Sequence, residues 1–192
     1  MLVQAAMALW RTNGYAGTTV AQICTAAGVS KALFYFYFPR KEDVLFEVGV
    51  MSTRAAQRTA AQLLDTGADY DIGEIVAAAL ASMEKSMSRN PRELIIETIL
   101  EGYRHEHRIM TGATPETPDL DGGMFTALFA RAVADGKLPA STDVDHLTYL
   151  AMTLVSEGAR HWAAGTFGQR SFGEVVGADI ATLIAGLTTT TH

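Results

Sequence analysis

Apolar residues recur at intervals of three and four along almost the whole chain, and no stretch alternates strictly between apolar and polar residues. The first spacing is typical of amphipathic helices, whereas half-buried strands require the second. Glycine, asparagine and proline interrupt the pattern and indicate helix ends. We therefore predict an all-α protein of about nine helices. After a first helix in the opening residues, the predicted helices cover about 20–27, 31–37, 41–64, 71–89, 91–110, 124–135, 144–166 and 172–187.

Two short helices near the beginning of the chain are separated by one tight turn. Gly28 tolerates the positive φ that such a turn needs, and Ser30 is a good N-cap for the second helix. Pro39 lacks an amide hydrogen and ends that helix. Phe34 and Phe38 lie four residues apart and therefore share the inward face. This arrangement is the helix-turn-helix signature, in which the second helix reads DNA.

A longer run of residues surrounds this helix pair with a characteristic order and spacing. Its members are Gly14, Tyr15, Thr18, Thr19, Val20, Ile23, residues 27–31, residues 33–35, residues 37–39 and residues 41–43. Over about residues 2–47 this run resembles the amino-terminal domain of the TetR family of transcriptional regulators. The resemblance implies an N-terminal three-helix helix-turn-helix DNA-binding domain over residues 1–46, followed by a helical ligand-binding and dimerisation domain over residues 47–192.

The resemblance also implies how the second short helix meets DNA. We expect base contacts from Lys31, Ala32 and Leu33, since the two apolar side chains can touch the methyl group of thymine. A phenol hydroxyl is a suitable neutral donor to a phosphate oxygen. The expected phosphate contacts come from Thr19, Tyr35, Tyr37 and Lys41.

The net charge of −6 is unevenly distributed along the chain. Residues 1–46 contain four cationic and two acidic side chains, a net charge of +2, which leaves −8 for the remaining 146 residues. A weakly positive head can approach phosphates, while an acidic body resists nonspecific binding to nucleic acid. With so few cations, specificity should depend on a dimer that engages two half-sites of a palindromic operator.

The later helices contain aromatic, methionine and histidine residues that can line a cavity. Simple core packing is the more conservative interpretation, because methionine is an adaptable core residue. On the functional interpretation, these residues bind a small apolar or aromatic effector. In the family, effector binding shifts the fourth helix and releases the DNA. The predicted effector-binding residues are Met83, Met87, Tyr103, Phe125, Phe129, Met152, His161 and Trp162.

The last two predicted helices are long and carry apolar stripes. In the TetR family these helices pack against those of a second subunit, so the resemblance implies a homodimer through residues 144–187. A striped helix often packs within its own chain, and the pattern agrees with both arrangements. Close helix approach, which slightly favours an interface, is permitted by the small residues Gly158, Ala159, Ala163 and Ala164.

No constellation of residues predicts an enzyme, a metal site or a cofactor. His105 and His107 are two residues apart and face away from each other on a helix, so residues 103–108 are interpreted as a solvated helix end. Cys24 lies on an inward helix face and is expected to be a packed thiol. Nothing resembles a signal peptide or a membrane span, so we expect a cytoplasmic protein.

The sequence favours a ligand-responsive transcriptional repressor, which binds its operator DNA as a homodimer. Two alternatives stay open: an activator with the same fold, and an all-α small-molecule-binding protein or small enzyme that has kept a vestigial head. Two features depart from the family pattern. The chain begins almost inside the first helix, which indicates a trimmed start or an absent minor-groove arm. Arg40 replaces a small capping residue and either adds a phosphate contact or weakens the cap.

Overall fold

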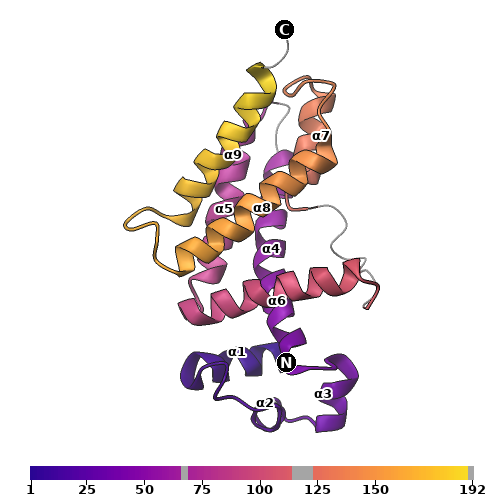
Figure 1. Cartoon of the computed structure of the whole chain (residues 1–192), viewed down its shortest axis with the longest axis vertical. Coiled ribbons are helices and arrows are strands. Elements are labelled where there is room, and N and C mark those ends of the chain that lie inside the picture. The colour runs from indigo at the N-terminus through magenta and orange to yellow at the C-terminus, as the bar shows by residue number, and fades with distance from the viewer. Residues whose placement is uncertain (66–68, 114–122, 190–192) are drawn as a thin grey trace. The chain divides into compact units, whose positions relative to one another are not determined.

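The computed structural model describes residues 1–65, 69–113 and 123–189, which form nine α-helices and no strand (Figure 1). The predicted all-α class is confirmed. The helices are α1 (Leu2–Asn13), α2 (Val20–Ala27), α3 (Lys31–Tyr37), α4 (Lys41–Asp65), α5 (Ile72–Met87), α6 (Arg92–Met110), α7 (Thr126–Ala134), α8 (Val144–Ala163) and α9 (Phe172–Thr189).

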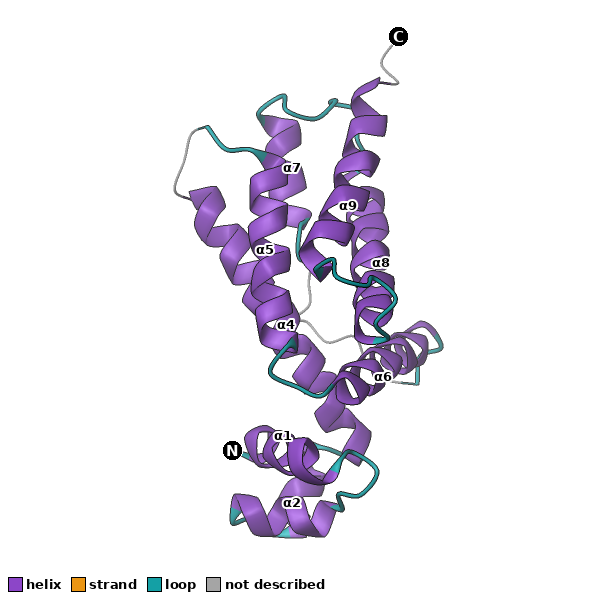
Figure 2. Ribbon diagram, turned by 90° about the vertical axis from the view of Figure 1, so that its left-hand side faces the viewer, coloured by secondary structure: helices purple, strands orange, loops and turns teal. Residues whose placement is uncertain are grey.

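Most helix ends lie within two residues of their predicted positions, and short loops connect the helices (Figure 2). α8 ends at Ala163, three residues earlier than expected, because Gly165 takes a positive φ and its N–H bonds back to the carbonyl of Trp162. The predicted loop at 111–123 and the predicted stop at 65–67 lie partly outside the described residues.

The helices form two compact units. The head unit comprises the described residues within Met1–Met51 and Met87–Glu116, and the body unit those within Ser52–Ser86 and Thr117–His192. α4 belongs to both units, since residues 41–51 lie in the head unit and residues 52–65 in the body unit. The same continuous helix therefore carries side chains of both units.

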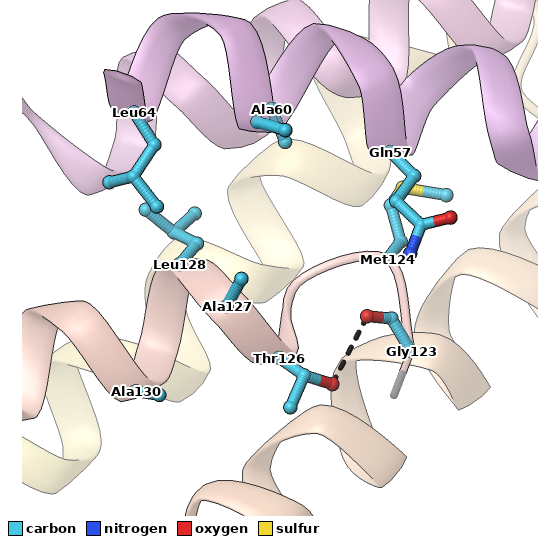
Figure 3. A pocket seen from close by; sticks show the side chains of 10 residues that line it. Gln57, Ala60, Leu64, Gly123, Met124, Thr126, Ala127, Leu128 and Ala130 are labelled. Atoms are coloured by element: carbon cyan, nitrogen blue, oxygen red, sulfur yellow. Dashed lines mark hydrogen bonds between the residues drawn. The ribbon is translucent and has the colours of Figure 1, made fainter. Parts of the chain in front are cut away.

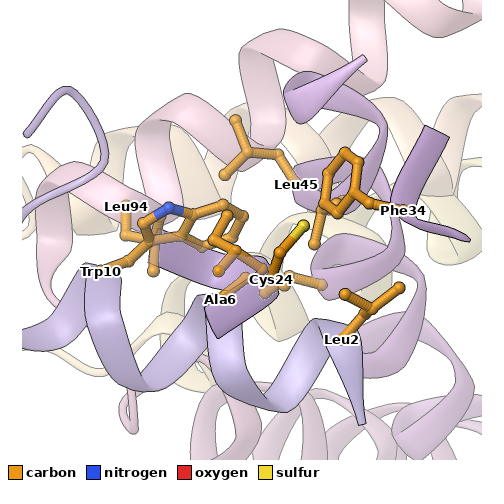
Figure 4. Close-up of a cluster of buried hydrophobic side chains, with 10 residues drawn as sticks. Leu2, Ala6, Trp10, Cys24, Phe34, Leu45 and Leu94 are labelled. Atoms are coloured by element: carbon orange, nitrogen blue, oxygen red, sulfur yellow. The ribbon is translucent and has the colours of Figure 1, made fainter. Parts of the chain in front are cut away.

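Apolar side chains from α1, α2, α3, α4 and α6 form the core of the head unit (Figure 4). Phe34 is fully buried, whereas Phe38 is partly buried against the same core, as the inward positions of the second short helix predict. The thiol of Cys24 is buried, which confirms its predicted packing. The buried members of this core are Leu2, Ala6, Trp10, Ile23, Cys24, Phe34, Val44, Leu45, Val48 and Leu94.

The turn between α2 and α3 has the predicted geometry. Gly28 lies in the left-handed region with φ 67° and ψ 33°, a conformation that costs a glycine little. Its N–H and that of Val29 bond to carbonyls in the last turn of α2, the latter to Cys24 at 3.0 Å. The Ser30 hydroxyl accepts the N–H of Leu33 at 3.1 Å and caps α3. These local bonds fix the angle at which α3 leaves α2.

In the body unit, α8 and α9 lie side by side (Figure 1). Gly158 of α8 faces Val176 of α9 so closely that an added Cβ would collide with a methyl group of that valine. The small size of Gly158 therefore serves contact within the chain, and it no longer supports a subunit interface. The predicted homodimer itself remains a prediction.

Candidate DNA-binding surface and effector site

α3 presents an exposed, largely aromatic surface. Phe34 is its one buried residue, and every base-contacting residue predicted on this helix is exposed. The exposed fractions of Tyr35 and Tyr37 are 50% and 61%. The structure therefore places five of the seven predicted DNA contacts together on the outside of one helix. The exposed residues of α3 are Lys31, Ala32, Leu33, Tyr35, Phe36 and Tyr37.

Three of the four cationic side chains in residues 1–46 have partners inside the head unit. Arg11 donates to Oδ1 of Asn90, Arg40 is paired with carboxylates, and Lys41 donates to backbone carbonyls. Lys31, in the first turn of α3, is the one cation of the segment with no partner among the described residues. Arg11 and Lys41 keep their positive charge, because their partners are neutral, and Lys31 is the cation of the segment whose ammonium group is free to contact phosphate directly.

The ammonium group of Lys41 is held inside the head unit. It donates to the carbonyls of Tyr15 at 3.1 Å and Thr18 at 3.0 Å, and lies 4.0 Å from the centroid of the Tyr15 ring. The Tyr15 hydroxyl donates to Glu42 at 2.9 Å, and burial together with this bond raises the pKa of Tyr15. These contacts use two of the three ammonium protons. The expected phosphate contact of Lys41 stays a prediction.

The hydroxyl of Thr19 closes a capping box at the start of α2. It accepts the N–H of Gln22 at 3.3 Å and donates to Oε1 of Gln22 at 2.9 Å. Such reciprocal bonds satisfy amide groups that the helix leaves unpaired. The hydroxyl proton thus has a partner within the helix, and the expected phosphate contact of Thr19 also stays a prediction.

A fully buried glutamate on α6 binds three guanidinium groups. Oε1 of Glu101 accepts from Arg40 and from Arg108, each at 2.9 Å, and Oε2 accepts from Arg104 at 3.4 Å. Burial alone raises the pKa of Glu101, but the hydrogen bonds from Arg108 and Arg40 outweigh it and hold the pKa below its usual range. Pairing makes this buried charge tolerable.

Arg40 connects this glutamate to the beginning of α4. Its guanidinium is also paired with Asp43, whose Oδ2 accepts the backbone N–H of Arg40 at 2.8 Å. Asp43 therefore supplies one half of a capping box, because it accepts the N–H of the residue that precedes α4, whereas the Arg40 side chain has no oxygen that could accept an N–H of the first turn. Since Arg40 lies between α3 and α4, the Arg40–Glu101 contact connects the end of α3 to α6.

His105, one turn further along α6, stacks on Phe46 of α4. The ring centroids are 3.8 Å apart and the planes differ by 24°. Nε2 of His105 is buried without a hydrogen-bond partner among the described residues, and burial, reinforced by the charge of Arg108, lowers the pKa of His105. The interpretation of residues 103–108 as a solvated helix end is therefore wrong for His105 and Arg108, because both pack against neighbouring side chains. His107 is exposed as expected.

The predicted effector-binding residues on α7 and α8 belong to the body unit. Phe125 and Phe129 are fully buried with ring centroids 5.8 Å apart. Met152 is partly buried, and Trp162 lies with its ring centroid 6.3 Å from that of Phe172. His161 is exposed, which leaves it outside the buried aromatic groups.

The predicted effector-binding residues on α5 and α6 belong to both units. Met83 is buried in the body unit, and Met87 is buried in the head unit. Tyr103 is 39% exposed on α6, in the head unit. The sequence pattern did not indicate this division, because Met83 and Met87 share one face of α5 by their spacing and only packing decides which neighbours each residue meets.

A groove of about 300 Å³ lies between α4 and α7 in the body unit (Figure 3). Its volume lies at the lower end of the range for small-molecule sites. None of the eight predicted effector-binding residues lines this groove in the described part of the chain. The groove exists because small side chains of α4 and α7 face each other. Composition alone does not show which small residues of two helices will face each other. The lining residues are Gln57, Ala60, Ala61, Leu64, Gly123, Met124, Thr126, Ala127, Leu128 and Ala130.

Among residues 1–65, 69–113 and 123–189, no three histidine, cysteine, aspartate or glutamate side chains are grouped so that they could hold a metal ion. No helix in the same ranges has the length and apolar character needed to span a membrane.

Residues 2–48 match the family model for bacterial regulatory proteins of the tetR family. The matched segment contains α1, α2, α3 and the first turns of α4, which are the elements of the helix-turn-helix described above. The match covers 47 of the 192 residues and concerns the helix-turn-helix segment. The resemblance predicted over about residues 2–47 is thereby confirmed for this segment.

Solved structures of TetR-family regulators share this fold. FadR from Thermus thermophilus, a transcriptional repressor in complex with lauroyl-CoA, has a TM-score of 0.75 at 23% identity, covering 96% of this chain and 91% of its own. FadR from Bacillus subtilis in complex with stearoyl-CoA has a TM-score of 0.64 at 19% identity, covering 96% and 97%. PfmR, also from Thermus thermophilus, has a TM-score of 0.58 at 22% identity, covering 97% and 98%. No curated protein matched.

Three features of this chain were not predicted from the sequence. Phe36 was not assigned to the DNA-facing surface, although it is the most exposed aromatic residue of α3 at 78%. Its helical position opposite Phe34 was a usable signal. The buried charge of Glu101 and the groove between α4 and α7 gave no comparable signal, because both depend on contacts between segments far apart in the chain.

Proposed function

We propose that this protein is a TetR-family repressor that binds a palindromic operator as a homodimer and releases it on binding an apolar effector. The observation that carries the proposal is the exposed surface of α3, which presents Lys31 among uncharged side chains on a helix-turn-helix. Such a surface suits the major groove, where base edges give sequence information. Residues 1–46 form the DNA-binding domain in this proposal, and residues 47–192 form the ligand-binding and dimerisation domain.

The contacts to DNA fall into two groups in this proposal. Lys31, Ala32 and Leu33 contact base edges, and the hydroxyls of Tyr35 and Tyr37 donate to phosphates on either side. The exposure of all five side chains supports the assignment. Thr19 and Lys41 can add phosphate contacts only beyond the bonds that they already make within the head unit.

The weakness of a single head supports a homodimer, and the family resemblance is the basis for proposing residues 144–187 as its interface. The segment 1–46 carries a net charge of only +2, and three of its four cations have partners within the head unit. One head should therefore bind DNA weakly, and two heads on one palindrome combine their contacts.

The effector in this proposal is a molecule with a long apolar chain. The groove between α4 and α7 is lined largely by alanine, leucine and methionine, with Gln57 and Thr126 as polar groups. Two structural relatives of the same fold hold acyl-CoA thioesters, which makes lauroyl-CoA and stearoyl-CoA the first probes to use. An occupant of the groove would contact α4, the helix that begins two residues after Pro39. Effector binding would then favour the arrangement of heads that does not fit the operator.

A gel-shift experiment tests the proposal. The operator is selected from random duplex DNA with the purified full chain, and binding is titrated with and without lauroyl-CoA. We expect a specific shift that lauroyl-CoA reverses. Lys31→Ala should weaken specific binding about tenfold, because Lys31 is the exposed cation of α3. Lys85→Ala, an exposed lysine of α5 in the body unit, is the matched control and should leave the shift unchanged.

The result separates the proposal from its alternative. If no specific shift occurs at any salt concentration while lauroyl-CoA still binds, the chain is a ligand-binding protein without operator function. A specific shift that lauroyl-CoA does not reverse would support the proposed DNA-binding regulator and exclude acyl-CoA thioesters as its effector.

A further inference from the structure

Phe36 exposes an apolar ring in the last turn of α3, the second helix of the helix-turn-helix. Its exposed fraction is 78%, against 41% for Leu33 on the same helix. Burial of a phenyl ring normally contributes to folding, so a ring left in water forgoes that stabilisation. A binding partner that covers this ring would remove it from water, which would contribute favourably to the free energy of binding.

The direction of the ring follows from the helix geometry. Successive residues of an α-helix are rotated by about 100°, so Phe36 lies about 160° around the axis from Phe34. Phe34 is fully buried in the core of the head unit, and Phe36 therefore points almost directly away from that core. Ala32, one turn earlier, is exposed on nearly the same face and leaves room beside the ring. Tyr35 and Tyr37 lie on either side.

The neighbouring aromatic side chains keep the ring of Phe36 outside the core. Tyr37 packs against Phe36 edge to face, with ring centroids 5.2 Å apart and planes at 89°. Tyr35 packs instead against Phe34, with centroids 5.4 Å apart. Phe36 is thus supported from the side, and its outer face stays uncovered.

The chemistry of the major groove selects one partner for this ring. A phenyl group neither donates nor accepts a conventional hydrogen bond, whereas the base edges in the groove are polar except for the C5-methyl group of thymine. A phenyl ring pressed on a guanine or cytosine edge would remove water from polar atoms without replacing their hydrogen bonds. Contact with a thymine methyl group carries no such penalty.

We propose that Phe36 contacts the C5-methyl group of a thymine in the operator and so specifies an A·T pair at that position. The inference deepens the proposed function, on which it rests, and adds a residue to the base contacts assigned to Lys31, Ala32 and Leu33. DNA is the favoured occupant because the ring lies on the helix of the helix-turn-helix that also carries the exposed Lys31.

The test replaces each thymine of one selected half-site by deoxyuridine, which removes only the methyl group. At one position we expect the unsubstituted protein to lose about fourfold in affinity, the effect of one buried methyl group. Phe36→Ala should bind the thymine operator about tenfold more weakly and lose nothing further at that deoxyuridine. The dependence of affinity on salt should be the same for both proteins, because a phenyl ring releases no counterions.

Met110→Ala provides the matched control. Met110 is 79% exposed on α6 and lies outside the helix-turn-helix, so its loss should leave both the affinity and the deoxyuridine pattern unchanged. Circular dichroism checks that both variants keep their helices.

Several outcomes would overturn the inference. If Phe36→Ala keeps the full deoxyuridine pattern, the ring does not touch a thymine methyl group even if affinity falls. If Phe36→Ala changes only self-association of the protein without DNA, the ring serves a protein contact. If the unsubstituted protein selects no specific DNA, the proposed function fails first and this inference falls with it.

Discussion

At the scale of single residues, His105 shows how packing changes the chemistry of an ordinary side chain. Its ring is stacked on Phe46, and its Nε2 atom is buried without a partner among the described residues. Burial first, and then the charge of Arg108, hold the pKa of His105 below its usual value near 6.5. The neutral imidazole is therefore the form that fits the folded head unit.

This shift predicts that acid destabilises the protein. The unfolded chain binds a proton at His105 below about pH 6.5, whereas the folded chain binds it only at lower pH. The neutral ring of His105 makes its full contribution to the free energy of unfolding above about pH 6.5. This contribution decreases as the pH falls toward the pKa of His105 in the folded protein. In urea unfolding between about pH 7.5 and about pH 5.5, His105→Phe should lose less stability than the unsubstituted protein. His107→Phe, at an exposed position of the same helix, should retain the original pH dependence.

At the scale of elements, one buried carboxylate of α6 binds a side chain at the junction of α3 and α4. Glu101 holds Arg40 from the junction and Arg108 from its own helix, and Leu94 of α6 lies in the core of the head unit. The polar and apolar contacts therefore act on the same pair of helices. If α6 moves while the ion pair persists, Arg40 must move with it.

Removal of this carboxylate should destabilise the head unit. In Glu101→Ala, Arg40 and Arg108 lose a charged partner, and breaking a buried pair costs about 3 kcal/mol, less where a partner is exposed to solvent as Arg40 is. The urea midpoint should fall accordingly. Glu106→Ala, at an exposed position of α6, should change stability by less than about 0.5 kcal/mol. Equal effects of the two variants would mean that the Glu101 cluster contributes no special stability.

At the scale of the whole molecule, α4 is the one helix whose turns are divided substantially between the two described units. Its residues 41–51 contribute Val44, Leu45 and Val48 to the head core, and its later turns contribute four lining residues to the groove against α7. The proposed effector response needs an element that meets both the effector and the head, and α4 has this position in the chain.

Filling the groove should therefore separate DNA binding from effector response. Ala61 lines the groove at an exposed position, so Ala61→Phe can occupy the space without replacing a core residue. We expect operator affinity to stay within about threefold while release by lauroyl-CoA requires at least about tenfold more ligand. Gln62→Phe, at the next exposed position of α4, does not line the groove and should respond normally. Equal release of both variants would place the effector elsewhere, for example at the residues predicted from sequence.

The sequence by itself determined the features that depend on neighbours in the chain. Gly28, Ser30 and Pro39 fixed the turn, the cap and the end of α3, because each acts through backbone conformation or hydrogen bonds within a few residues. Helical spacing located nearly all helix ends and the inward position of Phe34. The same local pattern was enough to recognise the TetR-type helix-turn-helix segment over residues 2–48.

Only the tertiary structure decided which side chains remain available for function. Lys41 is held by carbonyls more than 20 residues earlier in the chain, and Arg40 meets a glutamate 61 residues later. A methyl group of a valine on the next helix occupies the space beside Gly158. The groove is formed by two helices that are far apart in the sequence. Spacing along the chain cannot reveal such partners, because the burial and charge of a side chain depend on everything that folding brings within contact distance.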